Sequence, residues 1–243
     1  MRIVSIIMGA YQCSSFIRDS VNSVLNQTLP EGWELELLVG VDGCPETLEV
    51  VKTIQHPSLT IYEMDQNYGT YIVANTLIQQ ARGEIIARVD ADDKVKPDRI
   101  AKIIFIFESR AKVGMVNTYY ESWYVKLGVK VEDVSKTADG VWAFRKEILD
   151  KAGGYMPWLC AADSELIDRL KFWGVPRYVI PEFLYIRQSH PNSLTTKGET
   201  RNGSPLRTQY RDYILHNRGA YKKGVSPEQI TPETGRIKNV IRS

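Results

Sequence analysis

Three carboxylates stand within four residues in the segment Asp90-Ala91-Asp92-Asp93. A folded protein tolerates their mutual repulsion mainly where a cation or a donor-rich ligand compensates it. Carboxylate oxygens suit Mg²⁺ or Mn²⁺, and the spacing allows Asp90 and Asp92 to face one site while Ala91 turns away. The alternative is a solvated acidic turn ahead of the next helix. The acidic segment alone leaves open both a Mn²⁺ or Mg²⁺ site at Asp90 and Asp92 and a solvated turn.

Two further residues with chemical potential follow apolar runs. Asp42 comes directly after residues 35–41, and Tyr11 comes shortly after residues 2–8. An acid at a strand end is able to accept hydrogen bonds from a ribose or a base, and an aromatic ring is able to stack on a base. The alternatives are an ordinary Asp-Gly turn at Asp42 and a core-filling role for Tyr11. These patterns alone favour the turn at Asp42 and leave both roles open for Tyr11.

A third acid stands at the start of a predicted helix. Asp163 is suited to act as a general base that removes a proton from an acceptor hydroxyl, and its alternative role is a helix cap. Glu165 and Asp168 are rival bases, although Asp168 and Arg169 have the pattern of helix-surface charges. His190, beside Pro191, is either a further metal ligand or diphosphate donor, or a structural residue.

In the first half of the chain, the sequence predicts alternating strands and helices, and these elements must position the candidate residues. Apolar runs predict strands, and 3.6-residue periodicity predicts helices. The predicted strands cover residues 2–8, 35–41, 59–64 and 84–89, and the predicted helices cover residues 14–27, 46–54 and 70–81, with another that starts at Pro97. This alternation is typical of a mainly parallel sheet, whose ligands lie beyond the carboxyl ends of its strands. The acids at positions 42 and 90 should therefore open onto one edge.

The pattern changes after residue 112. Strand-like segments at 113–118, 122–126, 129–134 and 140–144 lack long intervening helices, which predicts a smaller antiparallel or mixed sheet. A helix at 162–173, short strands near Tyr178 and Tyr185, and a helix at 206–221 follow. We therefore expect one α/β domain over residues 1–200, with a nucleotide-binding half (1–112), an acceptor-binding half (113–200) and a basic C-terminal segment (201–243).

The composition narrows the functional classes. The net charge of +2 is too balanced to indicate broad nucleic-acid binding, and three unpaired cysteines indicate a reducing compartment. No apolar run reaches the roughly 20 residues that span a bilayer, so we expect a cytoplasmic protein. From Arg201 onward, nine basic residues face three acidic ones. This segment is predicted to be a solvated helix; peripheral contact with an anionic membrane and a homodimer contact are the alternatives.

Several segments, in this order along the chain, resemble motifs of the family 2 glycosyltransferases with the GT-A fold. The matching segments are Val4-Ser5-Ile6-Ile7-Met8-Gly9-Ala10-Tyr11, Asp42-Gly43, Asn67-Tyr68-Gly69 through Asn75 to Ala81-Arg82-Gly83, Asp90-Ala91-Asp92-Asp93 with Pro97-Asp98-Arg99, Phe144-Arg145 with Gly153-Gly154-Tyr155, Asp163, and His190-Pro191-Asn192-Ser193-Leu194. The order of these pieces is much more specific than any one of them.

The resemblance implies a GT-A (Rossmann-like) mixed α/β sheet flanked by helices, and an inverting transfer from a nucleotide-diphosphate sugar. A UDP-sugar is favoured over a dTDP-sugar, and the acceptor is a glycan or a lipid-linked saccharide. It implies that Asp163 is the catalytic base and that a metal ion binds Asp90, Asp92 and His190. The donor would be bound by Ala10, Tyr11, Asp42, Asn67, Asp90, Ala91 and Asp92.

Three positions depart from the family's usual pattern: Val41 and Ala162 stand where an acid is usual, and Ala74 stands where an arginine is usual. These departures leave fewer polar side chains to contact the base of the nucleotide. They motivate one alternative function, a binding module that holds a nucleotide sugar or glycan without turnover. A sugar nucleotidyltransferase is a second alternative, although residues 9–12 are not the glycine-rich basic loop that grips a triphosphate. A dehydrogenase is disfavoured because no Gly-x-Gly-x-x-Gly follows the first strand.

Overall fold

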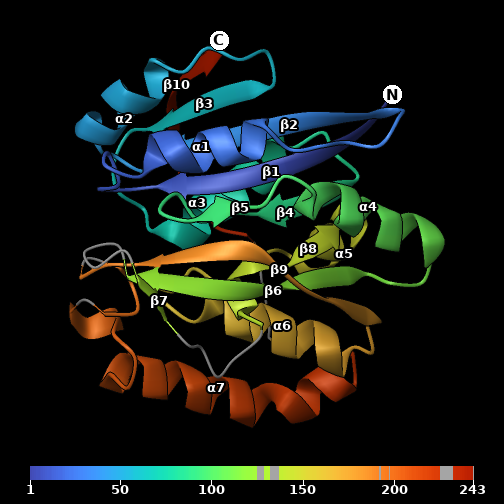
Figure 1. Cartoon of the computed structure of the whole chain (residues 1–243). Coiled ribbons are helices and arrows are strands. Elements are labelled where there is room, and N and C mark those ends of the chain that lie inside the picture. Colours follow the sequence, from blue (N-terminus) through green and yellow to red (C-terminus); the bar gives the residue numbers. More distant parts are fainter. Residues whose placement is uncertain (125–128, 132–136, 192, 197, 225–231, 243) are drawn as a thin grey trace.

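The computed structural model describes residues 1–124, 129–131, 137–191, 193–196, 198–224 and 232–242. Its centre is a single sheet with a parallel part and a mixed part (Figure 1). The parallel part consists, in sheet order, of β3 (Leu59–Met64), β2 (Trp33–Val41), β1 (Arg2–Ala10) and β4 (Ile85–Arg88). Apolar residues line both faces of β1 and β2, as is usual for parallel strands covered by helices. The four strands predicted in the first half of the chain are confirmed.

The strands after residue 112 extend this sheet instead of forming a separate one. They are β8 (Ala143–Arg145), β6 (Met115–Tyr124), β9 (Arg177–Ser189) and β7 (Val129–Val131), which pairs with β6. The short β5 (Lys94–Val95), from the first half of the chain, pairs with β9 at the edge of the sheet. β8 runs antiparallel to β4, β6 antiparallel to β8, and β9 parallel to β6. The mixed strand directions agree with the prediction, but the expectation of a separate, smaller sheet is wrong, because β4 pairs with β8 and joins the two halves.

Two pairs of segments that were predicted as separate short strands each form one long strand. The segments at 113–118 and 122–126 belong to β6, and the strands near Tyr178 and Tyr185 belong to β9. The register between β6 and β9 shifts from Thr118↔Ile180 to Tyr119↔Phe183, so Pro181 falls within an irregularity. A proline lacks the N–H that a regular ladder needs, and a bulge accommodates it. Residues 125–126 and 132–134 of the predicted strands lie outside the described residues.

Helices cover both faces of the sheet and enclose two apolar cores. One core lies under α1 (Ile17–Leu25), α2 (Pro45–Lys52) and α4 (Arg99–Ser109). The other lies under α3 (Thr70–Gln80), α5 (Lys146–Ala152) and α6 (Ala162–Phe172). The sequence predicts all of these helices except α5. Buried apolar residues hold α3 and α6 against the sheet. Both helices start near the edge where the parallel strands have their carboxyl ends.

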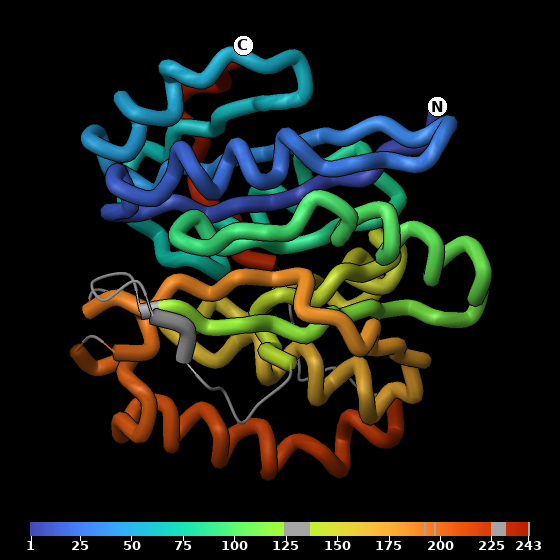
Figure 2. Tube along the Cα trace, viewed as in Figure 1, coloured from blue at the N-terminus to red at the C-terminus, as the bar shows by residue number. Residues whose placement is uncertain are grey.

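The segment after residue 200 returns to both halves of the molecule. α7 (Pro205–Lys222) packs on α6, and β10 (Ile237–Arg242) pairs antiparallel with β3 at the edge of the sheet. Figure 2 shows these two elements on opposite sides of the molecule. The helix predicted at 206–221 is confirmed, whereas β10 was not predicted because an edge strand is only partly buried. Among the helices of the described residues, none is long and apolar enough to cross a bilayer.

Candidate active site

A cavity of about 550 Å³ opens at the carboxyl ends of the parallel strands. Asp42 follows β2, Asp90 and Asp92 follow β4, and Asp163 lies in the first turn of α6. Parallel strands bring their carboxyl ends to one edge, so these acids meet although they are far apart in sequence. The predicted site residues that line the cavity are Tyr11, Asp42, Asn67, Asp90, Ala91, Asp92, Asp163 and His190. Ala10 is buried in β1 and does not line it.

The acidic loop after β4 is anchored to β9 through Asp93. Its carboxylate accepts hydrogen bonds from the Tyr185 hydroxyl at 2.8 Å and the Gln188 N–H at 2.7 Å. The backbone N–H of Asp90 donates to the same Tyr185 oxygen at 3.1 Å. Burial raises the pKa of Asp93 well above its usual range. Asp93 therefore holds the loop in place, while Asp90 and Asp92 remain partly exposed in the cavity.

Arg88 is a site residue that sequence reasoning missed. Its Nη2 donates to Asp90 Oδ1 at 2.8 Å and to Thr70 Oγ1 at 3.2 Å, and it lines the cavity. Partial burial raises the pKa of Asp90, and the Arg88 guanidinium opposes that shift. An arginine inside the apolar run before Asp90 was an available signal, because a buried charge needs a partner.

Asp92 and His190 form a second polar pair in the cavity. Asp92 Oδ2 lies 2.9 Å from His190 Nε2. The His190 ring also stacks on Phe16, with their centroids 4.6 Å apart, which fixes its orientation. Within the described part of the chain, no group of three or more His, Cys, Asp or Glu side chains is arranged as a metal site. Asn192, in the same predicted motif, lies outside the described residues.

Asp163 lies across Gly140 from Asp90. Its Oδ1 accepts hydrogen bonds from the Tyr71 hydroxyl and from the Ser164 N–H, both at 2.9 Å. A Cβ atom placed on Gly140 would lie 3.2 Å from Asp163 Oδ2 and 3.9 Å from Asp90 Oδ2. One added methyl group would therefore reach both carboxylates. Ala161 stands at the N-cap position of α6 without a side-chain hydrogen bond, and Asp163 satisfies the first-turn N–H of Ser164 through Oδ1 alone.

The two rival acids of α6, Glu165 and Asp168, form ion pairs outside the cavity. Glu165 forms a fully buried ion pair with Arg169 at 2.9 Å and accepts a hydrogen bond from the Tyr221 hydroxyl at 2.9 Å. Asp168 pairs with Arg218 at 2.6 Å. The prediction that Arg169 is a surface charge is wrong, because its side chain lies in the core and is neutralised by Glu165. Neither rival acid lines the cavity.

The carboxylate of Asp42 is largely engaged in hydrogen bonds from residues 67–69. Its carboxylate accepts hydrogen bonds from the Tyr68 N–H at 2.7 Å, the Gly69 N–H at 2.9 Å and the Asn67 amide at 3.1 Å. Burial raises the pKa of Asp42, while these backbone donors oppose the shift. Asp42 therefore fixes the turn before α3. Tyr11 is 47 % exposed at the cavity, so it does not fill the core.

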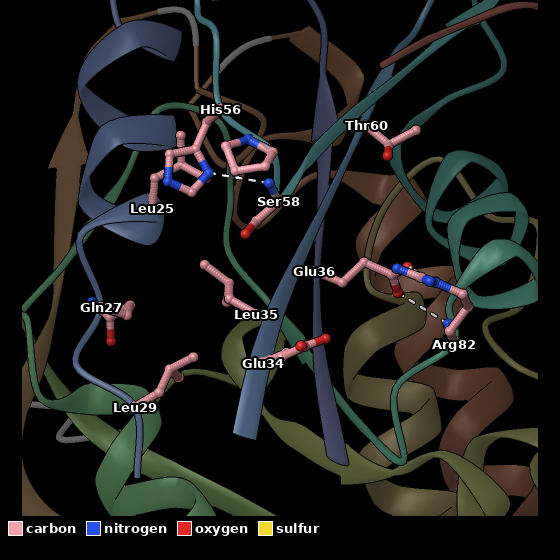
Figure 3. Close-up of a pocket in the computed structure, with 11 residues that line it drawn as sticks. Leu25, Gln27, Leu29, Glu34, Leu35, Glu36, His56, Ser58, Thr60 and Arg82 are labelled. Carbon is pink, nitrogen blue, oxygen red and sulfur yellow. Dashed lines mark hydrogen bonds and ion pairs between the residues drawn. The ribbon is translucent and has the colours of Figure 1, made fainter. Parts of the chain in front are cut away.

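A second cavity of about 460 Å³ lies at the opposite ends of β2 and β3 (Figure 3). Glu36 there accepts hydrogen bonds from the Ser5 hydroxyl at 2.5 Å and from Arg82 Nε at 2.6 Å. Burial opposes ionisation of Glu36, but these donors outweigh it and hold its pKa below the usual value. This cavity contains none of the predicted site residues, and Arg82, a residue of the matched motifs, serves the fold here.

Comparison with known proteins identifies the family of the chain. The sequence profile described as "Glycosyl transferase family 2" matches residues 5–192. A putative teichuronic acid biosynthesis glycosyltransferase, TuaG of Bacillus subtilis, is 31% identical over 102 residues, which are 41% of this chain and 40% of that protein. The chondroitin synthase of Escherichia coli is 31% identical over 119 residues, which are 48% of this chain and 17% of that protein. The chain thus spans less than half the length of these relatives.

Solved structures share the fold at low sequence identity. Staphylococcus aureus TarS 1–349, in complex with UDP-GlcNAc, superposes with a TM-score of 0.74 at 16% identity, over 96% of this chain and 69% of that one. The mannosyltransferase PcManGT of Pyrobaculum calidifontis, in complex with GDP-Man and Mn²⁺, gives a TM-score of 0.60 at 21% identity, over 95% and 67%. With its profile match over residues 5–192 and its mixed sheet, this chain belongs to glycosyl transferase family 2, a family of enzymes with the GT-A fold.

Proposed function

We propose that the chain transfers a sugar, with inversion, from a UDP-sugar to a hydroxyl group of a glycan or a lipid-linked saccharide. One observation carries this proposal: Asp163 presents its Oδ2 toward Asp90 across Gly140, in a cavity that also holds Asp42 and Asp92. An incoming hydroxyl and a departing diphosphate need such opposed groups. A base must lie on one side of the reacting carbon and a charge-neutralising site on the other.

The reaction is a single displacement. Asp163 removes the proton from the acceptor hydroxyl while the acceptor oxygen forms a bond to the anomeric carbon. The bond between that carbon and the diphosphate oxygen breaks on the opposite face, and the nucleotide diphosphate leaves with the electron pair. Attack from the face opposite the leaving group inverts the anomeric configuration.

Asp92 and His190 fit a divalent metal ion. A carboxylate oxygen and an imidazole nitrogen that meet at 2.9 Å in a cavity are suitable ligands for Mn²⁺. Magnesium and manganese sites commonly combine one or two protein ligands with substrate phosphates and water, so two protein ligands suffice. Asp90, whose Oδ1 accepts a hydrogen bond from Arg88, would be a further ligand. The metal ion, when bound, neutralises charge on the leaving diphosphate.

The donor and acceptor assignments draw support from relatives. TarS has been solved with UDP-GlcNAc, and relatives of this chain carry names of polysaccharide synthesis such as chondroitin synthase. We assign the nucleotide to residues 1–112, with Tyr11, Asp42 and Asn67 near the base and ribose, and the acceptor to residues 113–200. A dTDP-sugar is the second choice, because Val41 and Ala74 leave fewer polar side chains to contact uracil.

A thermal-shift screen tests this proposal. UDP-N-acetylglucosamine, UDP-glucose, dTDP-glucose and GDP-mannose would each be added with and without Mn²⁺. A ligand that binds only the folded state raises its stability by mass action, by about 2.7 kcal/mol at one hundred times its Kd. We expect a UDP-sugar to give the largest shift, and only with Mn²⁺. Stabilisation without nucleotide release in any acceptor mixture would favour a binding module, and the absence of any shift would refute the proposal.

A further inference from the structure

The two oxygens of the Asp163 carboxylate lie in different surroundings. Both hydrogen bonds that the described residues make to it, from the Tyr71 hydroxyl and the Ser164 N–H, end on Oδ1. Oδ2 lies on the side of Gly140, and Asp90 Oδ2 lies across the same glycine. One oxygen is therefore held by the protein, and the other faces the cavity.

The side chain of Tyr71, which donates to Asp163 Oδ1, is itself held in place by the residues packed around it. Its side chain is 2 % exposed, and its ring lies 5.6 Å from the ring of Tyr155. The Arg88 guanidinium lies 5.4 Å from the centre of the Tyr71 ring. Burial raises the pKa of Tyr71 well above its usual value, and the charge of Asp163 adds to the shift. The hydroxyl group therefore stays protonated and can only donate to the carboxylate.

The Ser164 N–H alone does not fix which oxygen faces the cavity. The terminal torsion of an aspartate is broad and two-fold, so a single donor allows the two oxygens to exchange places. The Tyr71 hydroxyl approaches from α3, a different helix from the one that carries Asp163. Two donors from separate elements restrain both the torsion and the position of the carboxylate.

We propose that Tyr71 is a positioning residue for Asp163: its hydroxyl group holds Oδ1 so that Oδ2 receives the proton of the acceptor. This inference rests on the proposed function, because it takes Asp163 as the base. In the transfer step the acceptor proton passes to Oδ2, the acceptor oxygen bonds to the anomeric carbon, and the diphosphate leaves with the electron pair. Tyr71 keeps its own proton throughout.

The test compares two tyrosines of the same cluster. Tyr71→Phe removes the donor to Asp163, and Tyr155→Phe is the control, because its ring lies beside Tyr71 but its hydroxyl makes no hydrogen bond to Asp163 among those described. The substrate would be UDP-N-acetylglucosamine, or whichever sugar nucleotide stabilises the chain most, with Mn²⁺ and with water as the acceptor. A hydrogen bond to a charged group is worth about 1.5–3 kcal/mol. We therefore expect kcat of Tyr71→Phe to fall about ten- to one-hundred-fold, with the donor Kd unchanged.

A double-mutant cycle separates this role from a structural one. In an Asp163→Asn background, Tyr71→Phe should lower the residual rate no further, because the carboxylate through which it acts is gone. Equal effects of Tyr71→Phe and Tyr155→Phe, or an undiminished effect of Tyr71→Phe in the Asp163→Asn background, would overturn the inference. If Asp163→Asn alone kept the wild-type rate, the proposed function itself would fail.

Discussion

Gly140 provides the sharpest test of the geometry between the two acids. Gly140→Ala adds one methyl group 3.2 Å from Asp163 Oδ2 and 3.9 Å from Asp90 Oδ2. Gly140 does not have a positive φ, so alanine adds no backbone strain there. The methyl group, which lies nearer to Asp163, would occupy space that the acceptor oxygen needs as it approaches the anomeric carbon. A misplacement of about 1 Å in a reacting pair costs about one hundred-fold in rate.

We expect Gly140→Ala to lower kcat about one hundred-fold while the donor Kd changes little. Nucleotide release would be measured at saturating donor, with donor binding followed by calorimetry and stability by urea unfolding. Gly219→Ala is the matched control, because Gly219 lies in α7 with open space around its Cα and no positive φ. That variant should be fully active and up to about 1 kcal/mol more stable. A Gly140→Ala protein that turns over at the wild-type rate would refute the placement of the reacting atoms between Asp163 and Asp90.

Two further predictions concern the metal pair and the second cavity. His190→Ala should weaken Mn²⁺-dependent donor binding and leave metal-free nucleotide binding unchanged, which calorimetry with and without EDTA checks; equal weakening under both conditions would argue against a ligand role. The ionised Glu36, whose pKa is lowered, should stabilise the fold above its ordinary value of 4.5 and lose that contribution as the pH falls through the lower folded value. Glu36→Gln should therefore make the free energy of unfolding, measured with urea at a series of pH values, depend less on pH below about 4.5. An unchanged pH dependence would contradict this.

The parallel half of the fold was predictable because its signals are local. Continuous apolar runs separated by amphipathic helices determine β1 to β4 and the helices between them. β9 was split in the prediction because Pro181 interrupts a strand pattern, and only the pairing with β6 shows that the strand continues through a bulge. β10 was missed because its residues are mostly exposed, and its partner β3 lies far away in the sequence.

The site was predictable only in part, and for the same reason. Acids at the ends of parallel strands must share one edge, so the meeting of Asp42, Asp90 and Asp92 follows from the strand pattern. Which of their oxygens are occupied depends on tertiary contacts. The turn that donates hydrogen bonds to Asp42 and the hydroxyl of Tyr71 on Asp163 come from segments that no local pattern connects to these acids.

Asp163→Asn tests the central claim most directly. The substitution keeps the size of the side chain and removes its ability to take a proton. A general base contributes about two to four orders of magnitude to a rate. We predict that nucleotide release and sugar transfer fall by about that factor, while calorimetry with Mn²⁺ gives the same donor Kd as the wild-type protein. Near-normal transfer by Asp163→Asn would contradict the account.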